Sequence, residues 1–237
     1  MDAVPFALLD RIIDGHEACD NEFFDLGRNI GWTREQLEKY SLDYRYWIRA
    51  FPGILAALIG RSPDPEFQFF MTQILHSELG SGDRTRMHFR LFERILRKLG
   101  LSDAEIESGP KFEETRWLVS GMFALYGDKD LLRAMGAQYA LEKQAFPMIE
   151  KLYLGFKHYK ELTRDDLEYF ELHLVEEPEH LACMQECMAR CVESPSDASR
   201  VEAGALACLD LIAAFWRRMY AEVTRVDRGG LLAARSS

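Results

Sequence analysis

Residues 164–192 read RDDLEYFELHLVEEPEHLACMQECMARCV, and this stretch indicates the fold class. Its apolar stripe includes Phe170, Leu181 and Met184, which follow the 3.6-residue period of an α-helix rather than the alternation of a strand. Two further members of the stripe, His173 and Glu177, are ionisable where an apolar side chain is expected. The stretch therefore predicts a long helix that turns titratable groups toward the protein interior.

The rest of the chain repeats this helical period without a convincing alternating segment, so we predict an all-α fold. Three pairs place a capping hydroxyl three residues before a side-chain acceptor: Thr33 and Gln36, Ser102 and Glu105, Thr163 and Asp166. Glycine, proline and serine residues mark the breaks. The expected helices span roughly residues 4–14, 20–28, 34–59, 64–79, 83–99, 102–107, 110–126, 129–158, 164–192 and 196–224.

The chain has 237 residues, of which 48% are apolar, enough for one well-packed domain. We expect this domain to span residues 1–226 and the segment 227–237 to be a disordered tail. The formal charge is −10 without a basic block, which disfavours nucleic-acid binding. Because no apolar stretch approaches the ~18 residues of a membrane span and no secretion signal is recognisable, we expect a cytoplasmic protein without membrane contact.

Three other expected helices also carry an ionisable residue on the apolar stripe: Glu78, His88 and Glu142. Each one alone has an ordinary explanation, because core histidines are often hydrogen-bonded and a buried glutamate can pair with an arginine. Several ionised carboxylates in one apolar interior would nevertheless oppose folding unless something compensates their charge.

A pair of metal ions would supply this compensation. His180 follows Glu177 by three residues and lies within about 60° of His173 on the helix surface. Carboxylates and imidazoles without thiolates suit iron or manganese, and such sites leave positions open for dioxygen and substrate. The candidate ligands are Glu78, His88, Glu142, His173, Glu177 and His180.

Other residues near these helices are candidates for substrate binding or for local strain. Tyr44 lies in an aromatic segment that either packs the core or walls a substrate pocket. Arg45 and Arg49, one turn apart, either bind a substrate carboxylate or form a solvated face. Pro178 removes the hydrogen bond to the carbonyl of Leu174 and should kink or loosen the ligand-bearing helix.

The spacing of the candidate ligands, with His173-x-x-x-Glu177-x-x-His180 as its last part, resembles the haem-oxygenase-like dimetal oxidases. The segments YSLDY (40–44), AFP (50–52), YALEKQ (139–144) and YFELH (169–173) are similar to the branch that contains the chlamydial protein associating with death domains. Thiaminase II and pyrroloquinoline-quinone synthase share this fold without such a metal site, so the fold alone leaves the function open.

The resemblance implies an up-and-down helical bundle with two irons, Fe(II) or Fe(III), that react with dioxygen, with manganese as an alternative metal. It also implies that the six residues named above are the ligands. Glu177 departs from the aspartate of many relatives. The p-aminobenzoate synthases of this branch use a lysine ten residues after the central glutamate, where this chain has Leu152, with Lys151 one position early.

On this resemblance we expect an oxidase that removes hydrogen from an unactivated aliphatic C–H bond of a small free substrate, most simply an amino acid. Desaturation, oxidative cleavage and hydroxylation are all compatible with it. An external electron donor and a homodimer are further expectations.

Two alternatives stay open at this point. In the first, the protein is a self-sacrificing p-aminobenzoate synthase that consumes Tyr44 or Tyr46. In the second, it is a metal-free hydrolase or a non-catalytic binding protein. That hydrolase would need a nucleophilic cysteine, and three of the five cysteines form a regular helix stripe instead: Cys183, Cys187 and Cys191.

Overall fold

A computed structural model describes residues 6–233, and within this range the chain is built from helices without strands. The expected all-α class is therefore confirmed. The helices are α1 (Phe6–Asp14), α2 (Glu22–Asn29), α3 (Arg34–Ile59), α4 (Pro65–Glu78), α5 (His88–Lys98), α6 (Asp103–Ile106), α7 (Glu113–Tyr126), α8 (Leu131–Lys157), α9 (Glu168–Cys191) and α10 (Pro195–Ala233). Two short 3-10 helices are η1 (Arg84–Arg86) and η2 (Asp165–Leu167).

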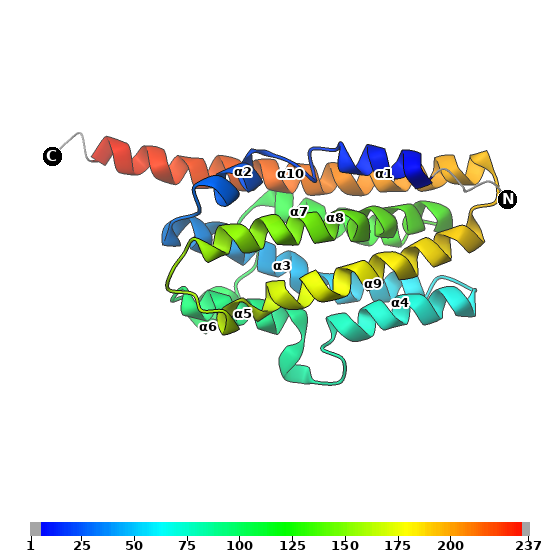
Figure 1. The fold of residues 1–237 in the computed structure, drawn as a ribbon, viewed down its shortest axis with the longest axis horizontal. Helices are drawn as coiled ribbons and strands as arrows, with labels where there is room; N and C mark the ends of the chain where they lie inside the picture. Colours follow the sequence, from blue (N-terminus) through cyan, green and yellow to red (C-terminus); the bar gives the residue numbers. More distant parts are fainter. Residues whose placement is uncertain (1–5, 234–237) are drawn as a thin grey trace.

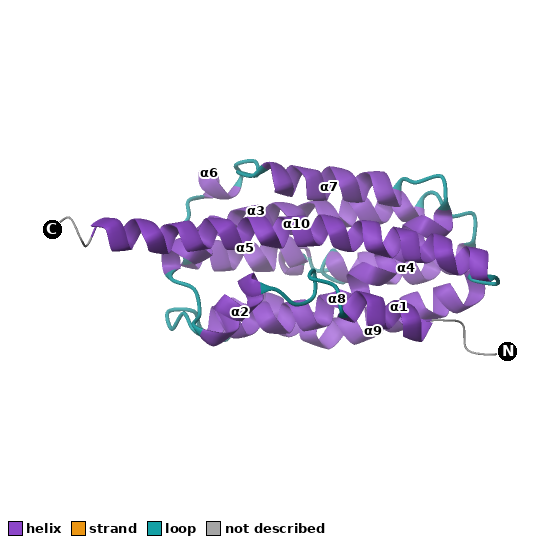
Figure 2. Ribbon diagram, turned by 90° about the horizontal axis from the view of Figure 1, so that it is seen from above, coloured by secondary structure: helices purple, strands orange, loops and turns teal. Residues whose placement is uncertain are grey.

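The long helices lie side by side along the long axis of the molecule (Figure 1). Helix α8 packs against both α9 and α10, while α3 packs against α7 and α10. Helices α4 and α5 follow one another along the same side of the bundle, and the loop between them protrudes (Figure 1). Figure 2 shows the bundle from above, where helices again make up most of the molecule and the α1–α2 connection crosses its middle.

Side-chain caps fix several helix starts as the sequence predicts. The hydroxyl of Thr33 accepts from the backbone N–H of Gln36, and the Gln36 side chain accepts from the Thr33 N–H at 2.8 Å. Ser102 and Glu105 form the same reciprocal pair. Helix α7 begins differently, because the buried Asp43 of α3 accepts hydrogen bonds from the first turn of α7 and ties the two helices together.

Three helix limits differ from those expected by four residues or more. The expected helix 83–99 is interrupted, because Met87 is extended and separates η1 from α5. Helix α9 is preceded by η2, so its regular part begins four residues later than expected. Helix α10 continues to Ala233, into the segment expected to be a disordered tail, whose residues 234–237 lie outside the described range.

Helices α8 and α10 approach each other backbone to backbone. A Cβ atom on Gly136 would lie 2.0 Å from the carbonyl oxygen of Val201, and one on Gly204 would lie 1.9 Å from that of Arg133. Only glycine fits at these two positions, so the pair sets the spacing of the helices. Glu142 lies less than two turns further along α8, which means that this contact also fixes the depth of its side chain.

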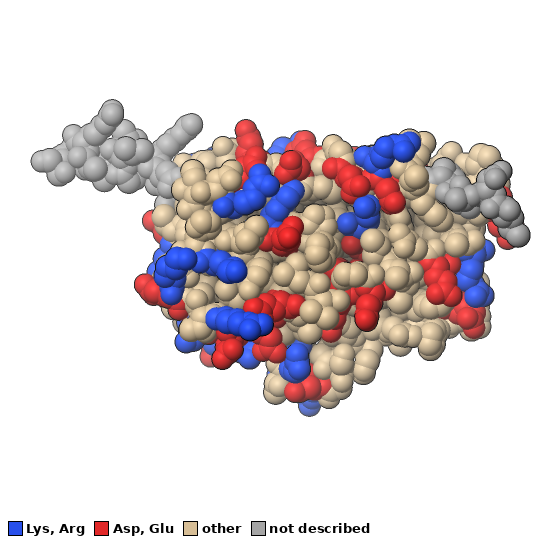
Figure 3. Space-filling model, in the orientation of Figure 1, with Lys and Arg blue, Asp and Glu red and all other residues tan. Residues whose placement is uncertain are grey.

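The surface has no single-sign area on the face shown in Figure 3, where Lys and Arg side chains stand among Asp and Glu side chains. Within the described part of the chain, no helix is both long enough and apolar enough to cross a membrane.

Candidate metal centre

The junction between α4 and α5 brings Glu78 and His88 together. Glu78 is the last residue of α4 and His88 the first of α5, and the loop between them folds outward from the bundle (Figure 1). Gly80 makes this turn possible, because its φ is +85° and a Cβ there would lie 2.3 Å from the carbonyl oxygen of Asp83. As a result, Nδ1 of His88 lies 3.0 Å from Oε2 of Glu78.

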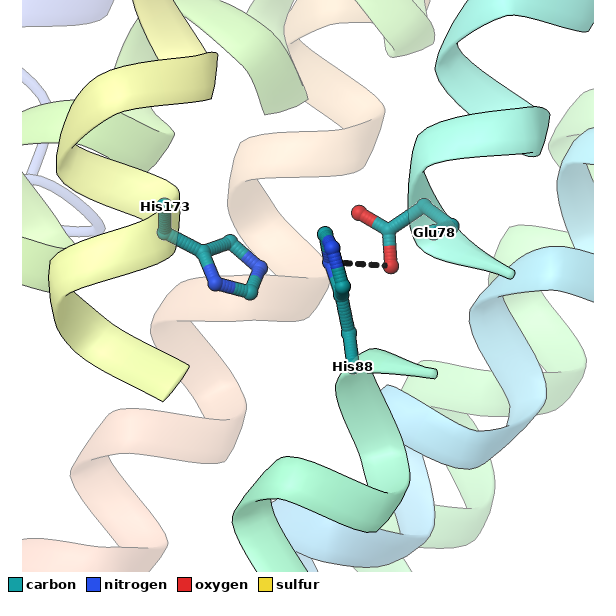
Figure 4. Close-up of side chains that lie close together, drawn as sticks. All are labelled: Glu78, His88 and His173. Atoms are coloured by element: carbon teal, nitrogen blue, oxygen red, sulfur yellow. Dashed lines mark ion pairs between the residues drawn. The ribbon is translucent and has the colours of Figure 1, made fainter. Parts of the chain in front are cut away.

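Helix α9 supplies the third member of this group from the opposite side. His173 points toward the imidazole of His88, and the two ring centroids are 4.4 Å apart (Figure 4). Nδ1 of His173 lies 2.7 Å from the backbone carbonyl oxygen of Tyr169, so Nδ1 carries the proton and donates it to that carbonyl. This bond leaves the lone pair on Nε2 free to bind a metal ion.

A second group joins α8 to the next turns of α9. Nδ1 of His180 lies 3.6 Å from Oε2 of Glu142 and 4.0 Å from Oε2 of Glu177. The side-chain amide of Gln138 donates to the other oxygen of Glu142, and Gln138 in turn accepts a hydrogen bond from the Tyr126 hydroxyl at 2.6 Å. This chain of bonds orients the Glu142 carboxylate toward α9.

Each group offers three ligand atoms that lie within 4.8 Å of one another. Ligands about 2.1 Å from a common ion lie roughly 3–4 Å apart, so small side-chain adjustments suffice for coordination. The structure thus brings together all six predicted residues, in two neighbouring sets of three: Glu78, His88 and His173, then Glu142, Glu177 and His180.

The first group holds a charged pair in its metal-free form. Burial opposes ionisation of Glu78, but the attraction of the imidazoles, chiefly His88, outweighs it and lowers the pKa of Glu78 to about 2. Burial likewise disfavours the His88 cation, yet Glu78 and Glu176 raise the pKa of His88 to about 10. Burial and the charge of His88 lower the pKa of His173 to about 4, which keeps that imidazole neutral.

The second group contains more negative charge than it can hold without a cation. Burial, followed by repulsion from Glu142 and Glu78, raises the pKa of Glu177 well above its ordinary value. Burial opposes the His180 cation, but the nearby carboxylate of Glu142 outweighs this and raises the pKa of His180. Without a metal, a proton therefore takes the place of a cation on Glu177.

The residues present fit a pair of metal ions. Oε2 of Glu177 is buried and has no hydrogen-bond partner among the described residues, and neither ring nitrogen of His88 makes an aligned hydrogen bond. Buried polar atoms are normally satisfied, so these atoms are free to serve as ligands. The donor set of carboxylates and imidazoles without thiolate is the one that iron and manganese accept.

A cavity of about 60 Å³ reaches the two groups, several times the ~10–15 Å³ that one water needs. The carboxylates of Glu78, Glu142 and Glu177 line its inner end, and apolar side chains from α3, α7, α8 and α10 form most of its wall. Tyr44 also lines it, with its hydroxyl 3.3 Å from that of Tyr169. Tyr44 thus lies in the wall of the cavity that the candidate ligands share.

The two arginines proposed from the sequence to bind substrate do not reach this cavity. Nε and Nη2 of Arg45 donate to Glu93 of α5 at 2.9 and 2.5 Å, and both side chains are buried. Arg49 is half exposed and pairs with Glu107 at 2.7 Å. Neither arginine lines the cavity, because carboxylates elsewhere in the fold bind both guanidinium groups.

Pro178 does not interrupt α9, which continues as one α-helix from Glu168 to Cys191. The proline leaves the carbonyl of Leu174 without its usual donor, one residue after the candidate ligand His173.

Three polar residues near the centre were not singled out from the sequence. Glu176 lies 3.3 Å from Nε2 of His88 and accepts a hydrogen bond from Ser77 at 2.5 Å. Gln138 orients Glu142, and Gln144 lines the cavity. Helical spacing offers a signal only for Gln138, which lies one turn before Glu142. The other two come close through the packing of α4, α8 and α9, which the sequence pattern does not specify.

The cysteines do not provide an activated nucleophile. Burial raises the pKa of all five thiols, to about 11 for Cys19 and about 12 for Cys187. A nucleophilic cysteine requires the opposite shift, toward the thiolate. None of the five lines the cavity, which weighs against the metal-free hydrolase with a catalytic thiol.

Comparison with known proteins gives a family match over most of the chain. A family described as iron-containing redox enzymes matches residues 39–213. The 4-chloro-allylglycine synthase of Streptantibioticus cattleyicolor is 25% identical over 205 residues, which cover 86% of this chain and 78% of that protein. The 4-aminobenzoate synthase of Chlamydia pneumoniae is 26% identical over 166 residues, which cover 70% and 73%.

Solved structures share the fold at low sequence identity. A CADD-like protein of unknown function from Nostoc punctiforme superposes with a TM-score of 0.78 at 18% identity, covering 92% of this chain and 96% of that one. A domain with a heme oxygenase-like fold from Shewanella denitrificans gives 0.70 at 16% identity, covering 95% and 93%. The fold that the sequence resemblance implied is confirmed.

Proposed function

The chain belongs to the family of iron-containing redox enzymes, and from this premise we propose that it is a di-iron oxidase. One iron would be held by Glu78, His88 and His173. The other would be held by a second set: Glu142, Glu177 and His180. Manganese in one position is compatible with the same ligands. The observation that carries the proposal is that both ligand sets are buried and contribute carboxylates to one apolar cavity.

We further propose that the reaction removes hydrogen from an aliphatic C–H bond of a small free substrate, most simply an amino acid. Bound irons would supply the activation of dioxygen that such a bond requires, with electrons from an external donor where the reaction needs them. The similarity to a 4-chloro-allylglycine synthase supports this substrate class, because the product in that name is an unsaturated amino acid.

The residues of the chain itself contribute positioning and exclusion of water. Apolar side chains such as Trp47, Phe51 and Met148 line the cavity and would hold an aliphatic chain against the ligand carboxylates. The same wall keeps bulk water away from the reacting carbon, which protects reactive species from side reactions. His173 keeps a fixed orientation through its hydrogen bond to the Tyr169 carbonyl.

Iron binding is the direct test. We expect the metal-free protein, loaded with Fe(II) without oxygen and then desalted, to retain two irons per chain by elemental analysis. Glu142→Ala and His173→Ala each remove a ligand and should lower this number, while Glu179→Ala, on the exposed face of α9, should not. Equal iron content in all four proteins would overturn the proposal.

The substrate class is tested separately. The Fe(II)-loaded protein is mixed rapidly with oxygen in the presence of individual amino acids or fatty acids, and the visible absorbance is followed. We expect a transient that depends on an amino acid. A transient that appears only with fatty acids would leave the di-iron centre in place and contradict the amino-acid assignment.

A second candidate function is favoured by one observation. Tyr44 lines the cavity and its hydroxyl lies 3.3 Å from that of Tyr169, so a tyrosine is available for oxidation beside the ligands. Together with the similarity to 4-aminobenzoate synthases, this supports a reaction in which the protein consumes its own tyrosine. Against it, Leu152 replaces the lysine of those enzymes, and Lys151 is bound to Asp20 at 2.8 Å, outside the cavity.

A further inference from the structure

Gln144 has a buried side-chain oxygen without a partner. Its side chain is 1% exposed, and Oε1 accepts no hydrogen bond from any described group. Nε2 donates to the backbone carbonyl of Leu141 at 3.3 Å. Because the amide nitrogen must face that carbonyl, the orientation of the amide is fixed and Oε1 remains an unused acceptor. Leaving such a group unsatisfied costs about 1–3 kcal/mol, so natural proteins rarely retain one without a use.

Gln144 is part of the lining of the cavity of the proposed iron centre. Gln144 lines the cavity from α8, on the same helix as Leu141 and Met148, while Glu142 contributes its carboxylate at the inner end. When metal ions bind, the carboxylates become ligands and Gln144 Oε1 is left as an acceptor that is not coordinated. A ligand that donates a hydrogen bond would satisfy it.

The charges around the cavity favour an amine over a carboxylate. None of the described residues that line it is a lysine or an arginine, and Arg45, the one arginine among the buried described residues, is bound to Glu93. A substrate carboxylate would therefore find no cationic side chain on the wall. An ammonium or amino group would find the unsatisfied oxygen of Gln144 as its acceptor.

We propose that Gln144 binds the amino group of the substrate and so makes this cavity selective for aliphatic primary amines, including amino acids bound through an amino group. This inference rests on the proposed function, because it assigns the substrate class to the same site. The amine would be anchored on α8 by Oε1, and the aliphatic chain would lie along the apolar wall. Gln144 is thus a specificity-determining residue that does not touch the metals.

Binding of two matched probes tests the proposal without turnover. Butylamine and butyrate have similar chains and opposite head groups, and Trp47 and Trp216 in the cavity wall report binding by fluorescence. We expect the Fe(II)-loaded, oxygen-free protein to bind butylamine more tightly than butyrate. Gln144→Leu should weaken butylamine binding about tenfold, as expected for one lost hydrogen bond to a charged donor, and leave butyrate binding unchanged.

Two further variants separate recognition from repacking. Gln144→Glu keeps an acceptor and adds a negative charge, so it should retain butylamine binding and weaken butyrate binding further. Met148→Leu, one turn along α8 in the same wall, should change both probes equally. Because Gln144→Leu removes an unsatisfied polar group, it should unfold at the same temperature as the wild type or higher, and its loss of binding is then not a folding defect.

The outcomes distinguish this inference from the proposed function. If wild type and Gln144→Leu bind butylamine equally, or if butylamine binds no better than butyrate, the inference is overturned even when two irons are retained. If butylamine is preferred and the preference is lost in Gln144→Leu, the inference is supported, and iron content decides independently whether the centre is a di-iron oxidase.

Discussion

Glu177 is the buried carboxyl group that loses its proton least readily in the metal-free protein. Its pKa is raised well above the unfolded value of about 4.3, by burial first and then by Glu142 and Glu78. The folded chain therefore keeps a proton that the unfolded chain loses, so the free energy of unfolding contributed by this group falls as pH rises above about 4.5. Bound metal requires the carboxylate, which means that metal binding releases this proton.

Glu177→Gln should stabilise the metal-free protein at pH 7 and weaken its stabilisation by iron. We expect a gain of about 1–2 kcal/mol in the free energy of unfolding, since glutamine mimics the protonated acid, and a shallower fall in stability between pH 5 and 8. Denaturant unfolding in the presence of a chelator measures both. Glu179→Gln, exposed on the same helix, is the control, and equal pH slopes in wild type and Glu177→Gln would refute this account.

Arg45 has a structural role that can be separated from substrate binding. Arg45→Met leaves the buried Glu93 without its closest partner, with only Arg97 at 3.7 Å, and should lower the free energy of unfolding by about 3 kcal/mol. The double variant with Arg45→Met and Glu93→Leu should regain most of the lost free energy of unfolding, because burial of a poorly paired charge is the main cost. The free energy of unfolding is measured with denaturant, and the iron content of the same variants is measured by elemental analysis. A loss of iron in the double variant would contradict a purely structural role.

At the residue scale, the sequence predicts the candidate ligands better than the groups around them. Glu78, Glu142 and Glu177 are recognisable because each occupies a helix position where an apolar residue belongs. Gln144 and Glu176 give no such signal, since their importance arises from which helix faces them after packing. Arg45 shows the opposite error: a cation near an aromatic segment suggested substrate binding, and its partner Glu93 lies 48 positions away in the sequence.

At the scale of the elements, the helix starts with reciprocal caps and the breaks at glycines are predicted well, but the interruption at Met87 is not. The α4–α5 junction depends on Gly80 at positive φ and on an extended Met87, neither of which a helical period reveals. The helical period of the sequence does not predict the extra length of α10 either, because the Gly- and Ala-rich segment after residue 224 continues without a strong apolar stripe or a strong stop signal. The junction matters more, because it sets the distance between Glu78 and His88.

Pro178 should make α9 the helix that opens most easily. Pro178→Ala restores a donor for the Leu174 carbonyl and should slow amide hydrogen exchange around that turn, with a gain of about 1 kcal/mol or more in stability. Hydrogen exchange with mass spectrometry, on the metal-free protein, measures this locally. Glu179→Ala changes a neighbouring exposed side chain without adding a donor and should leave the exchange nearly unaltered. Unchanged exchange in Pro178→Ala would show that the proline does not loosen α9.

At the scale of the whole molecule, the centre draws on four helices that are distant in the sequence. Helices α4, α5, α8 and α9 contribute one or more side chains each, over roughly a hundred residues of chain. The stripes of the individual helices predict which residues turn inward. The division into two groups of three, and the shared cavity, depend on the packing of α8 against α9 and on the backbone contact between α8 and α10.

The mass of the whole chain separates the leading function from the self-sacrificing one. After Fe(II)-loaded protein reacts with oxygen and a reductant, we expect intact-protein mass spectrometry to show a chain without loss of a tyrosine side chain. The reason is that Leu152 and the Asp20-bound Lys151 leave no lysine in the place that the related reaction uses. A chain that has lost the Tyr44 side chain in wild type, with no such loss in Tyr44→Phe, would favour the alternative.

The outward loop between α4 and α5 has a consequence for how the protein tolerates cleavage. Its residues 81–86 are exposed and include Arg84 and Arg86, both sites for trypsin. A nick there separates the chain into two fragments, with Glu78 on the first fragment and His88 close to the start of the second. An ion bound by both would then bridge the fragments, so the nicked protein should remain assembled with iron and come apart more readily once a chelator removes it.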